Sequence, residues 1–371
     1  MSDLVEVAKK ILLENRRAGY TLPTNNKLYP AQWNWDSAFI SLGYSYFNLD
    51  YAIQELETLL KGQWDDGMVP HILFHEVDDS YFPNHTTWSC GKEIPSSGIT
   101  QPPIAASILR IIVKNNSLDE TQNKKVFNLV CKLKKYHEWF FKNRDQNQSG
   151  LISIIHPWES GYDNSPLWDF ALSKINVDKN LSYERRDLKV SKNDERPLKK
   201  DYDCYITLLN QFKSDNYNPN KLLNNSMFNI IDIGFNSIFL KANKDLIELL
   251  KLFKLDYLDL EEKIKKTENK IFDLYNEKEK MFFSFDLKNN EEIKIPSLTN
   301  FFILFADLNH DDVNTKIIKN LEDFNVNEKY FFTTIKPDHQ SFEEKRYWRG
   351  PVWINTNWII YKSLINKNRN F

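Results

Sequence analysis

The residues best suited to chemistry in this chain lie between His156 and Asp169. The stretch reads His-Pro-Trp-Glu-Ser-Gly-Tyr-Asp-Asn-Ser-Pro-Leu-Trp-Asp and holds three carboxylates and two tryptophans within fourteen residues. Two prolines, a glycine and an Asn-Ser pair predict a loop rather than a continuous helix or strand. Indole rings stack on the apolar face of a sugar, and a carboxylic acid beside a glycosidic oxygen can protonate the leaving group. The stretch therefore fits a sugar site, and equally a loop whose tryptophans fill a core while its carboxylates are solvated.

The composition limits the classes of protein that this chain can belong to. With 371 residues, 41% hydrophobic and 27% charged, it is long enough for a sizeable core. A net charge of -2 and a pI near 6.4 argue against nucleic acid or an anionic membrane as a partner. The sequence has no apolar run long enough to cross a bilayer, and its first residues lack the basic and apolar regions of a secretory signal. We therefore expect a cytoplasmic protein.

The sequence indicates no cofactor and no metal. Its three cysteines, Cys90, Cys131 and Cys204, are widely spaced and predict neither a disulfide framework nor a zinc site. A glycine-rich phosphate loop is also missing from the pattern. Aromatic residues are plentiful, at 10 Trp, 17 Tyr and 25 Phe. The tryptophans cluster beside acids and amides, as they would in a sugar site.

Apolar residues at helical spacing are the main signal of secondary structure. They predict helices over residues 4–18, 51–60, 104–113, 126–142, 228–241, 246–276 and 298–307, with a break near Tyr257 in the second-to-last of these. Three further helices are predicted with less complete bounds: one that runs through Ile40 and Tyr44, one that ends near Phe212, and a last one through Leu364. The range 252–280 is rich in Lys and Glu and predicts an exposed outer helix. Residues 63–72 and 146–154 share a polar turn, a glycine and an extended run, which hints at repeated helical hairpins. Few patterns alternate as strands do, so a helical toroid fits better than an α/β sheet.

Further segments outside the central loop combine aromatic and polar side chains. One such segment, Gln32-Trp-Asn-Trp-Asp36, comes before a helical run. Taken by itself, Asp36 is best explained as an acid that interacts favourably with the N-terminal end of the helix dipole. Gln101 precedes two prolines that fit the first turn of a helix. Arg196 lies in a charged segment of a kind that is usually solvated surface.

Together these segments resemble the mannosylglycerate and glucosylglycerate hydrolases of glycoside hydrolase family sixty-three. The resemblance rests on His156-Pro-Trp-Glu-Ser-Gly-Tyr-Asp-Asn-Ser-Pro, Tyr347-Trp-Arg-Gly-Pro-Val-Trp and Gln32-Trp-Asn-Trp-Asp, with the Gln101-Pro and Arg196-Pro segments in support. It covers essentially the whole chain. It implies an all-α fold, an (α/α)6 toroid forming a single domain over residues 1–371, with the active site at the mouth where long loops converge. It also implies inversion at the anomeric carbon.

The resemblance also implies a role for each site residue. It places the general acid at Asp163, whose pKa would be raised by burial among aromatic side chains and by a second carboxylate such as Glu159. It gives sugar-holding positions to Tyr29, Trp33, Trp35 and Asp36, further substrate-binding positions to Gln101, Trp158 and Glu159, and glycerate-binding positions to Arg196 and Tyr202. A guanidinium can form two parallel hydrogen bonds to a carboxylate. Tyr347, Trp348, Arg349 and Trp353 complete the implied wall of the site, although Arg349 fits a structural ion pair equally well.

The sequence departs from the family pattern at its end. In these hydrolases the general base is a glutamate tens of residues past the Tyr-Trp-Arg-Gly motif, followed by a last helix. This chain ends at Phe371, and Glu343 and Glu344 are not the family's base positions. We therefore expect a toroid that is incomplete at the C-terminus, and a 371-residue chain with poor or no hydrolase activity.

Three functions remain open from the sequence. The leading one is an inverting α-glycosidase acting on a small anionic glycoside, mannosylglycerate or glucosylglycerate, with that glycoside as the expected partner. The second is a trehalase-like or oligosaccharide α-glucosidase, against which the pair Arg196 and Tyr202 speaks modestly. The third is a catalytically inactive sugar-binding remnant.

Overall fold

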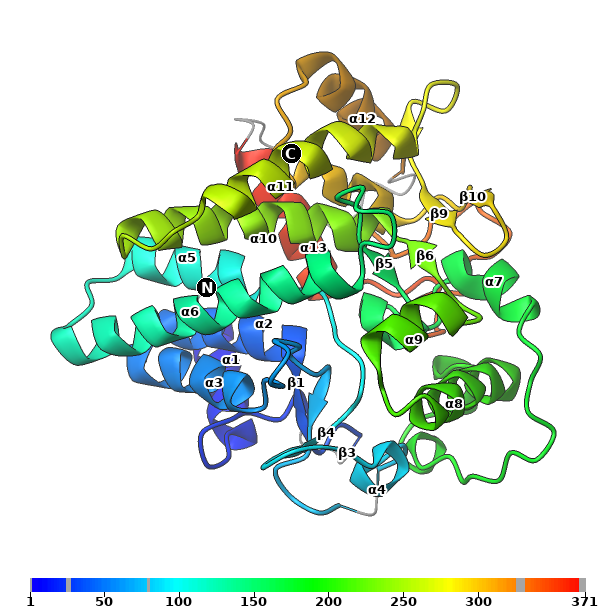
Figure 1. The fold of residues 1–371 in the computed structure, drawn as a ribbon, viewed down its shortest axis with the longest axis horizontal. Helices are drawn as coiled ribbons and strands as arrows, with labels where there is room; N and C mark the ends of the chain where they lie inside the picture. Colours follow the sequence, from blue (N-terminus) through cyan, green and yellow to red (C-terminus); the bar gives the residue numbers. More distant parts are fainter. Residues whose placement is uncertain (1, 25–27, 79–80, 325–330, 367–371) are drawn as a thin grey trace. The chain divides into compact units, whose positions relative to one another are not determined.

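Helices form most of the regular secondary structure in the computed structural model, which describes residues 2–24, 28–78, 81–324 and 331–366 (Figure 1). The α-helices are α1 (Ser2–Asn15), α2 (Asn34–Ser45), α3 (Leu49–Lys61), α4 (His85–Trp88), α5 (Ala105–Asn115), α6 (Glu120–Asn143), α7 (Asp169–Ser173), α8 (Lys199–Ser214), α9 (Pro219–Asn225), α10 (Ile233–Leu252), α11 (Leu258–Lys270), α12 (Asp311–Phe324) and α13 (Ile354–Asn366). The 3-10 helices are η1 (Pro157–Ser160), η2 (Pro166–Trp168), η3 (Asp187–Lys189), η4 (Asn193–Glu195), η5 (Ile271–Leu274) and η6 (Leu298–Leu304). This distribution agrees with the helical class expected from the sequence.

The strands are only two or three residues long and pair antiparallel. They are β1 (Gln32–Trp33), β2 (Ile72–Leu73), β3 (Cys90–Gly91), β4 (Pro95–Ser96), β5 (Ser153–Ile154), β6 (Ile230–Ile231), β7 (Tyr275–Asn276), β8 (Met281–Phe282), β9 (Ser284–Asp286) and β10 (Glu291–Ile293). Within the described residues they form sheets of order β1-β2-β4-β3, β10-β9-β6-β5 and β7-β8. In the first two sheets, Gln32 lies opposite Leu73 and Ser153 opposite Ile231. These short ladders fix where the long loops leave the helices.

The chain forms two compact units. Unit 1 contains Met1–Lys142, Tyr183–Ser191 and Ala242–Glu261, and unit 2 contains Asn143–Ser182, Lys192–Lys241 and Glu262–Phe371. Both units are built from discontinuous parts of the sequence. The single domain expected from the sequence stays a prediction.

In unit 1, α3 shows why these residues form a helix and bury one face. The Asn48 side chain accepts the backbone N–H of Tyr51 and so caps the first turn. The buried face carries Ala52, Ile53, Leu56, Leu59 and Leu60. Burial of each leucine side chain contributes about 1.5–3 kcal/mol. The face packs against α2, which directly follows β1.

Unit 2 has a core of large aromatic side chains beside its helices. Tyr205 and Phe212 on α8, Phe235 on α10, and Trp168 and Phe228 in the connecting segments are all fully buried. The ring centres of Trp168 and Phe228 lie 5.8 Å apart in an edge-to-face arrangement. This core includes Trp168 of the segment that the sequence singled out for chemistry, and Tyr205 bonds to the Asp163 carbonyl of the same segment.

Several helix boundaries differ from the sequence prediction. Trp35 and Asp36 lie inside the first turn of α2 and not before it. α10 continues to Leu252 where a gap between two helices was expected, because the polar side chain of Asn243 is hydrogen-bonded to His137 at 2.9 Å. The break expected near Tyr257 falls between α10 and α11, where Lys254 has a φ of 56°. The predicted helix over 298–307 is the 3-10 helix η6.

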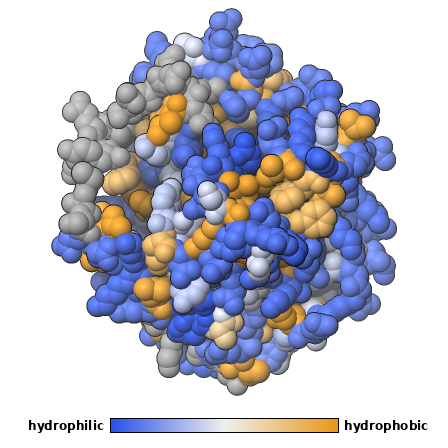
Figure 2. All heavy atoms as spheres, turned by 90° about the vertical axis from the view of Figure 1, so that its left-hand side faces the viewer, coloured by the Kyte–Doolittle hydropathy of each residue, from blue (hydrophilic) through white to orange (hydrophobic). Residues whose placement is uncertain are grey.

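The expected exposed outer helix is α11. It buries Leu260, Ile264 and Thr267 along one stripe, and most of its other residues are exposed or half-buried. This is the pattern of a surface helix whose charged side chains face solvent. On the face shown in Figure 2, hydrophilic side chains likewise predominate and surround smaller apolar patches.

Candidate active site

The segment from His156 to Asp169 consists of two short 3-10 helices, η1 and η2, joined by turns, and it leads into α7. Pro157 and Pro166 each open one of these helices, where a missing backbone N–H is tolerated. Gly161 ends η1 with a φ of 82°, a left-handed conformation that glycine adopts without steric cost. The irregular loop predicted from the sequence is confirmed. Most of it is buried.

The backbone around Asp163 is held from two directions. Tyr205, on α8, donates its hydroxyl to the Asp163 carbonyl at 3.0 Å. The side-chain oxygen of Asn164 accepts the backbone N–H of Trp348 at 3.0 Å, across 184 positions of sequence. Asp163 itself is half-buried. Proton transfer to one particular oxygen requires a carboxyl group whose backbone is fixed and whose side chain is still accessible to the substrate.

Tyr162, the residue before Asp163, is anchored in the core by a carboxylate that the sequence analysis missed. Its hydroxyl donates to Asp232, which also accepts the Ser284 hydroxyl at 2.8 Å and the Phe235 N–H at 2.9 Å. Burial raises the pKa of Asp232 above its ordinary value, although these hydrogen bonds oppose the shift. An acid placed directly before a helix is a capping signal. That signal points to helix α10 and not to the loop, so it could not have predicted this contact.

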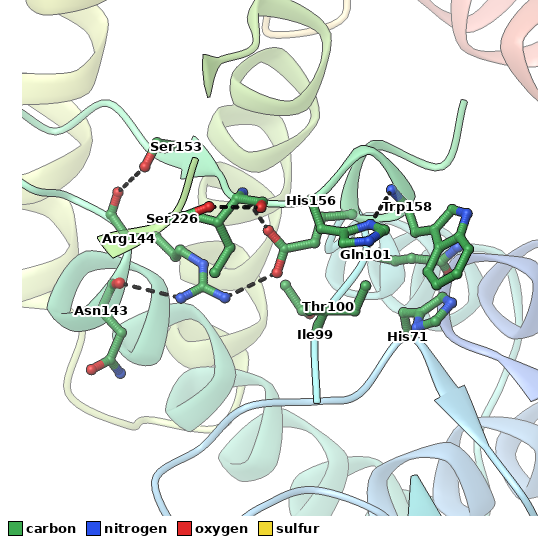
Figure 3. A network of polar contacts seen from close by, with 12 residues as sticks. His71, Ile99, Thr100, Gln101, Asn143, Arg144, Ser153, His156, Trp158 and Ser226 are labelled. Carbon is green, nitrogen blue, oxygen red and sulfur yellow. Dashed lines mark hydrogen bonds and ion pairs between the residues drawn. The ribbon is translucent and has the colours of Figure 1, made fainter. Parts of the chain in front are cut away.

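Glu159 lies in a buried ion pair. Its Oε1 accepts from Nη2 of Arg144 at 2.9 Å, and its Oε2 accepts the backbone N–H of Ile155 at 2.8 Å. The side chains of Glu159 and Arg144 are each 1% exposed. Figure 3 shows this network, in which dashed lines also join Arg144 to Ser153 and to Asn143. Both carboxylate oxygens thus hold the loop, and a role of Glu159 in substrate binding stays a prediction.

His156 supports the backbone of Trp158 in a neutral form. Its Nδ1 accepts the Trp158 N–H at 3.0 Å (Figure 3), so the ring proton is on Nε2, which lies 3.1 Å from the Tyr205 carbonyl. Burial lowers the pKa of His156 to about 3, although the Tyr205 carbonyl opposes this shift. The Trp158 ring lies 5.4 Å from the ring of Tyr205 and 6.2 Å from that of Tyr202.

Arg196 and Tyr202 lie at the N-terminal end of α8. Arg196 has extended backbone angles, as expected for a residue before proline, and is 7% exposed. Its guanidinium carbon is 4.3 Å from the centre of the Tyr347 ring. Tyr202 is buried in the first turns of the helix. The positive end of the helix dipole adds to the arginine charge and favours an anion here.

Tyr347, Trp348 and Trp353 form one aromatic cluster. The two indoles are stacked with ring centres 4.6 Å apart at 20°, and Tyr347 lies 5.8 and 5.6 Å from them. Nε1 of Trp353 donates to the Tyr347 carbonyl at 2.9 Å. The cluster also touches the central loop, because the Trp348 ring is 6.2 Å from that of Tyr162.

Arg349 is engaged in ion pairs. Its two terminal nitrogens each lie 2.8 Å from an oxygen of Asp169, and its Nε lies 2.7 Å from Glu343. These contacts match the structural alternative given above, while substrate binding by Arg349 stays a prediction. Glycine is required at position 350 because the backbone there lies close to that of Glu343: a Cβ at Gly350 would lie 2.3 Å from the Glu343 carbonyl oxygen.

In unit 1, the predicted sugar-holding residues gather around the start of α2. The side-chain oxygen of Gln101 accepts the backbone N–H of Trp35 at 3.2 Å. The rings of Tyr29 and Trp33 meet edge to face at 5.2 Å. Asp36 is half-buried, and burial raises its pKa to about 7 although its own backbone N–H opposes the shift. A carboxyl group in this state can either donate or accept a hydrogen bond near neutral pH.

Unit 1 also contains a buried carboxylate that the sequence did not reveal. Glu55 accepts from Thr21 at 2.9 Å, Gln32 at 3.0 Å and Ser37 at 2.8 Å. Burial raises its pKa to about 7, against the effect of these hydrogen bonds. The oxygen of Gln32 lies 2.7 Å from Nε2 of His75, whose pKa burial lowers to about 4. The network fixes β1, the strand that leads into the aromatic segment.

The structure therefore assembles the predicted residues into two groups, each within one unit. Unit 2 holds Trp158, Glu159, Asp163, Arg196, Tyr202, Tyr347, Trp348, Arg349 and Trp353. Unit 1 holds Tyr29, Trp33, Trp35, Asp36 and Gln101. The expected convergence of all these residues at one mouth stays a prediction.

Other features of the described residues bear on the sequence analysis. Cys90, Cys131 and Cys204 are free thiols. Within residues 2–24, 28–78, 81–324 and 331–366, no three His, Cys, Asp or Glu side chains are grouped as a metal site would need. None of the helices in these ranges is both long and apolar enough to cross a membrane.

Comparison with known proteins identifies the family. Residues 29–369 match the mannosylglycerate hydrolase MGH1-like glycoside hydrolase domain. The chain belongs to this family. A mannosylglycerate hydrolase from Thermus thermophilus is 40% identical to it over 358 residues, which are 95% of this chain and 86% of that protein. A glucosylglycerate hydrolase from Mycolicibacterium hassiacum is 30% identical over 90% of this chain and 79% of its own length.

A solved structure extends the match to three dimensions. A GH63 mannosylglycerate hydrolase from Thermus thermophilus, in complex with Tris and D-glycerate, aligns with a TM-score of 0.93 and 39% identity. The alignment covers 97% of this chain and 86% of the other. The chain is a glycoside hydrolase, and its all-α fold is of the (α/α)6 toroid class that the resemblance implied. The family predicted from the three sequence motifs is confirmed.

Proposed function

We propose that this chain is an inverting α-glycosidase that hydrolyses mannosylglycerate or glucosylglycerate to the sugar and glycerate. Relatives named for each of these two activities support the substrate class. A related structure is a complex with D-glycerate. Both substrates join a neutral sugar to a carboxylate. The site therefore needs a cation as well as aromatic surfaces that fit a sugar.

The observation that carries the proposal is the environment of Arg196. Its guanidinium is largely buried and lies over the Tyr347 ring, at the positive end of α8 and six positions before Tyr202. A partly desolvated guanidinium forms two strong, directed hydrogen bonds to a carboxylate and interacts less with a neutral hydroxyl. This favours an anionic glycoside over the neutral substrate of a trehalase-like enzyme.

The proposed chemistry begins at Asp163. Its carboxyl proton passes to the glycosidic oxygen as the bond from that oxygen to the anomeric carbon breaks. A water molecule attacks the anomeric carbon from the opposite face and gives its proton to a second carboxylate. The products are glycerate and a sugar of inverted anomeric configuration. Glu343 is poorly suited to be the second carboxylate because Arg346 and Arg349 both pair with it.

Each unit holds aromatic and polar groups of the kind that contact a sugar ring. Trp33, Trp35 and Trp158 supply apolar ring faces, and Asp36 and Gln101 supply hydrogen-bonding groups for hydroxyls. Gln101 already accepts from the backbone of Trp35, so its amide N–H groups are oriented by that contact.

The decisive experiment is calorimetric binding of mannosylglycerate and of its uncharged analogue mannosylglycerol. Arg196→Ala should weaken mannosylglycerate binding by roughly 1.5–3 kcal/mol, the value of a lost charged hydrogen bond, and leave mannosylglycerol nearly unchanged. Arg17→Ala is a control at an arginine outside the proposed site, because Arg17 donates to the backbone carbonyls of Glu14 and Arg16 and lies just after the end of α1. Equal losses for both ligands would reject the carboxylate site.

The stereochemistry needs a separate measurement. Proton NMR during the first minutes of hydrolysis, by a chain extended with a relative's C-terminal segment, should show the β-anomer of the free sugar appearing first. If the α-anomer appears first, the enzyme retains configuration and the inverting mechanism is wrong.

A further inference from the structure

Arg346 contacts the segment that carries the proposed carboxylate-binding arginine. Its Nη1 donates to the carbonyl of Arg196 at 2.7 Å and to that of Asn193 at 3.2 Å. Its Nε donates to Oε2 of Glu343 at 2.5 Å. The side chain of Arg346 is 14% exposed, so water competes little for these bonds. The side chain of Arg346 thus bonds to the backbone of Arg196, which lies 150 positions earlier in the sequence.

Tyr347 adds two more links between the same segments. Its backbone N–H donates to the Glu195 carbonyl at 3.2 Å, and its ring lies 4.3 Å from the Arg196 guanidinium. Tyr347 has a φ of 27°, which is sparsely populated by residues other than glycine. Such a conformation persists only where the surrounding contacts hold it. The contacts that hold it include the N–H and carbonyl bonds of Tyr347 itself and the bonds of Arg346, the preceding residue.

We propose that Arg346 is a positioning residue that fixes the direction of the Arg196 guanidinium and so sets the preference for carboxylate-bearing glycosides. The inference rests on the proposed function. Arg346 holds the Arg196 backbone directly and holds the guanidinium through the Tyr347 ring. An arginine side chain loses much rotamer entropy when it is confined to one direction. Where the protein has already confined it, the ligand does not bear that loss on binding.

The geometry explains why an arginine is needed at position 346. Nε and Nη1 of one planar guanidinium reach Glu343 on one side and two carbonyls on the other. A lysine ammonium is a single point and does not occupy both positions at once. Arg346→Lys therefore keeps the charge but loses part of the link. This gives a conservative variant whose expected defect is intermediate.

The experiment is a double-mutant cycle read by calorimetric binding of mannosylglycerate and mannosylglycerol. Arg346→Met should weaken mannosylglycerate binding about 10-fold and mannosylglycerol binding less than about twofold, in the range usual for contacting residues. Arg346→Lys should fall between Arg346→Met and the wild type. In an Arg196→Ala background, Arg346→Met should cause less than about a further twofold loss, because the group it positions is gone.

Controls separate this effect from loss of structure. Arg17→Met removes an arginine that also donates to two backbone carbonyls, at 3.1 and 3.0 Å, and should change neither affinity. If Arg346→Met does not fold, Arg346→Lys alone carries the comparison. Equal weakening of both ligands, or an undiminished loss in the Arg196→Ala background, overturns the inference while leaving the proposed function intact. If Arg196→Ala itself weakens both ligands equally, the proposed function fails and this inference fails with it.

Discussion

Replacing Arg144 with methionine should destabilise the protein by about 3–5 kcal/mol, the range observed when one partner of a buried ion pair is removed. The pair with Glu159 is 1% exposed on both sides, and its Nη2–Oε1 distance is 2.9 Å. After the substitution, the Glu159 carboxylate stays in the core without the Arg144 cation. The backbone N–H of Ile155 still donates to it at 2.8 Å, which offsets only part of the cost of burying the charge.

The double variant Arg144→Met/Glu159→Gln should be more stable than either single variant. It removes both charges, and the amide oxygen at position 159 can still accept the Ile155 N–H. The remaining cost is an amide N–H group in the core and some lost packing, about 1–3 kcal/mol. The two substitutions should therefore be strongly non-additive.

The assay is urea unfolding of the wild type, both single variants and the double variant, followed by tryptophan fluorescence and by circular dichroism. If both probes report the same transition, unfolding is two-state and its free energy can be calculated from the urea dependence. Lys124→Met serves as the control, because its ion pair with Glu120 is 74% and 84% exposed and should contribute at most about 1 kcal/mol. A loss below about 1 kcal/mol for Arg144→Met, or a double variant that loses the sum of the singles, would refute the reasoning.

Three further measurements test the site and its pH dependence. In a chain extended with the C-terminal segment of a relative, Asp163→Asn should lower turnover by on the order of 10²–10⁴ with little change in substrate affinity, and near-normal turnover would move the acid elsewhere. Asp36 has a folded pKa of about 7, above its ordinary value near 3.8, so its contribution to stability is full below about pH 4 and is lost as pH rises to about 7. As pH rises across that window, the wild type should therefore lose up to about 4 kcal/mol of unfolding free energy relative to Asp36→Asn. A difference between the two unfolding free energies that does not change with pH would contradict the raised pKa. His156 has a folded pKa of about 3, so its contribution to stability is full above about pH 6.5 and is lost as pH falls toward 3. His156→Gln should reduce this loss of stability at acid pH. The same fall in unfolding free energy in the variant and the wild type would contradict the lowered pKa.

The sequence by itself determined the helical class and the segments that carry chemistry. Helical spacing predicted α3 and α5 closely, because one face of each is apolar and their ends have recognisable signals, whereas only the end of α8 was predicted. The central loop was predictable because Pro157, Gly161 and Pro166 do not allow a regular element there. The motifs around Gln32, Asp163 and Tyr347 together indicated the family, since they are short, unusual in composition and correctly ordered.

The tertiary structure alone decided which charged residues are structural. Periodicity does not predict that Arg349 pairs with Asp169, 180 positions away, or that Glu159 pairs with Arg144. Ion-pair partners depend on how distant segments fold together, and the sequence around each charge shows only a polar residue. The gap predicted between residues 241 and 246 was wrong for the same reason, because a polar residue such as Asn243 is tolerated within α10 when a distant side chain, here that of His137, bonds to it.

Burial was also beyond the reach of the sequence, and with it the protonation states that matter for function. Glu55 and Asp232 resemble ordinary helix acids in sequence, yet both are enclosed in the fold and have raised pKa values. The pKa of a carboxyl group is set by its desolvation and by the donors around it, and both are properties of the packed structure. The sequence therefore determined which residues could act on a glycoside, whereas the packing of distant segments decided which of them are held in ion pairs and which are held in place beside Asp163 and Arg196.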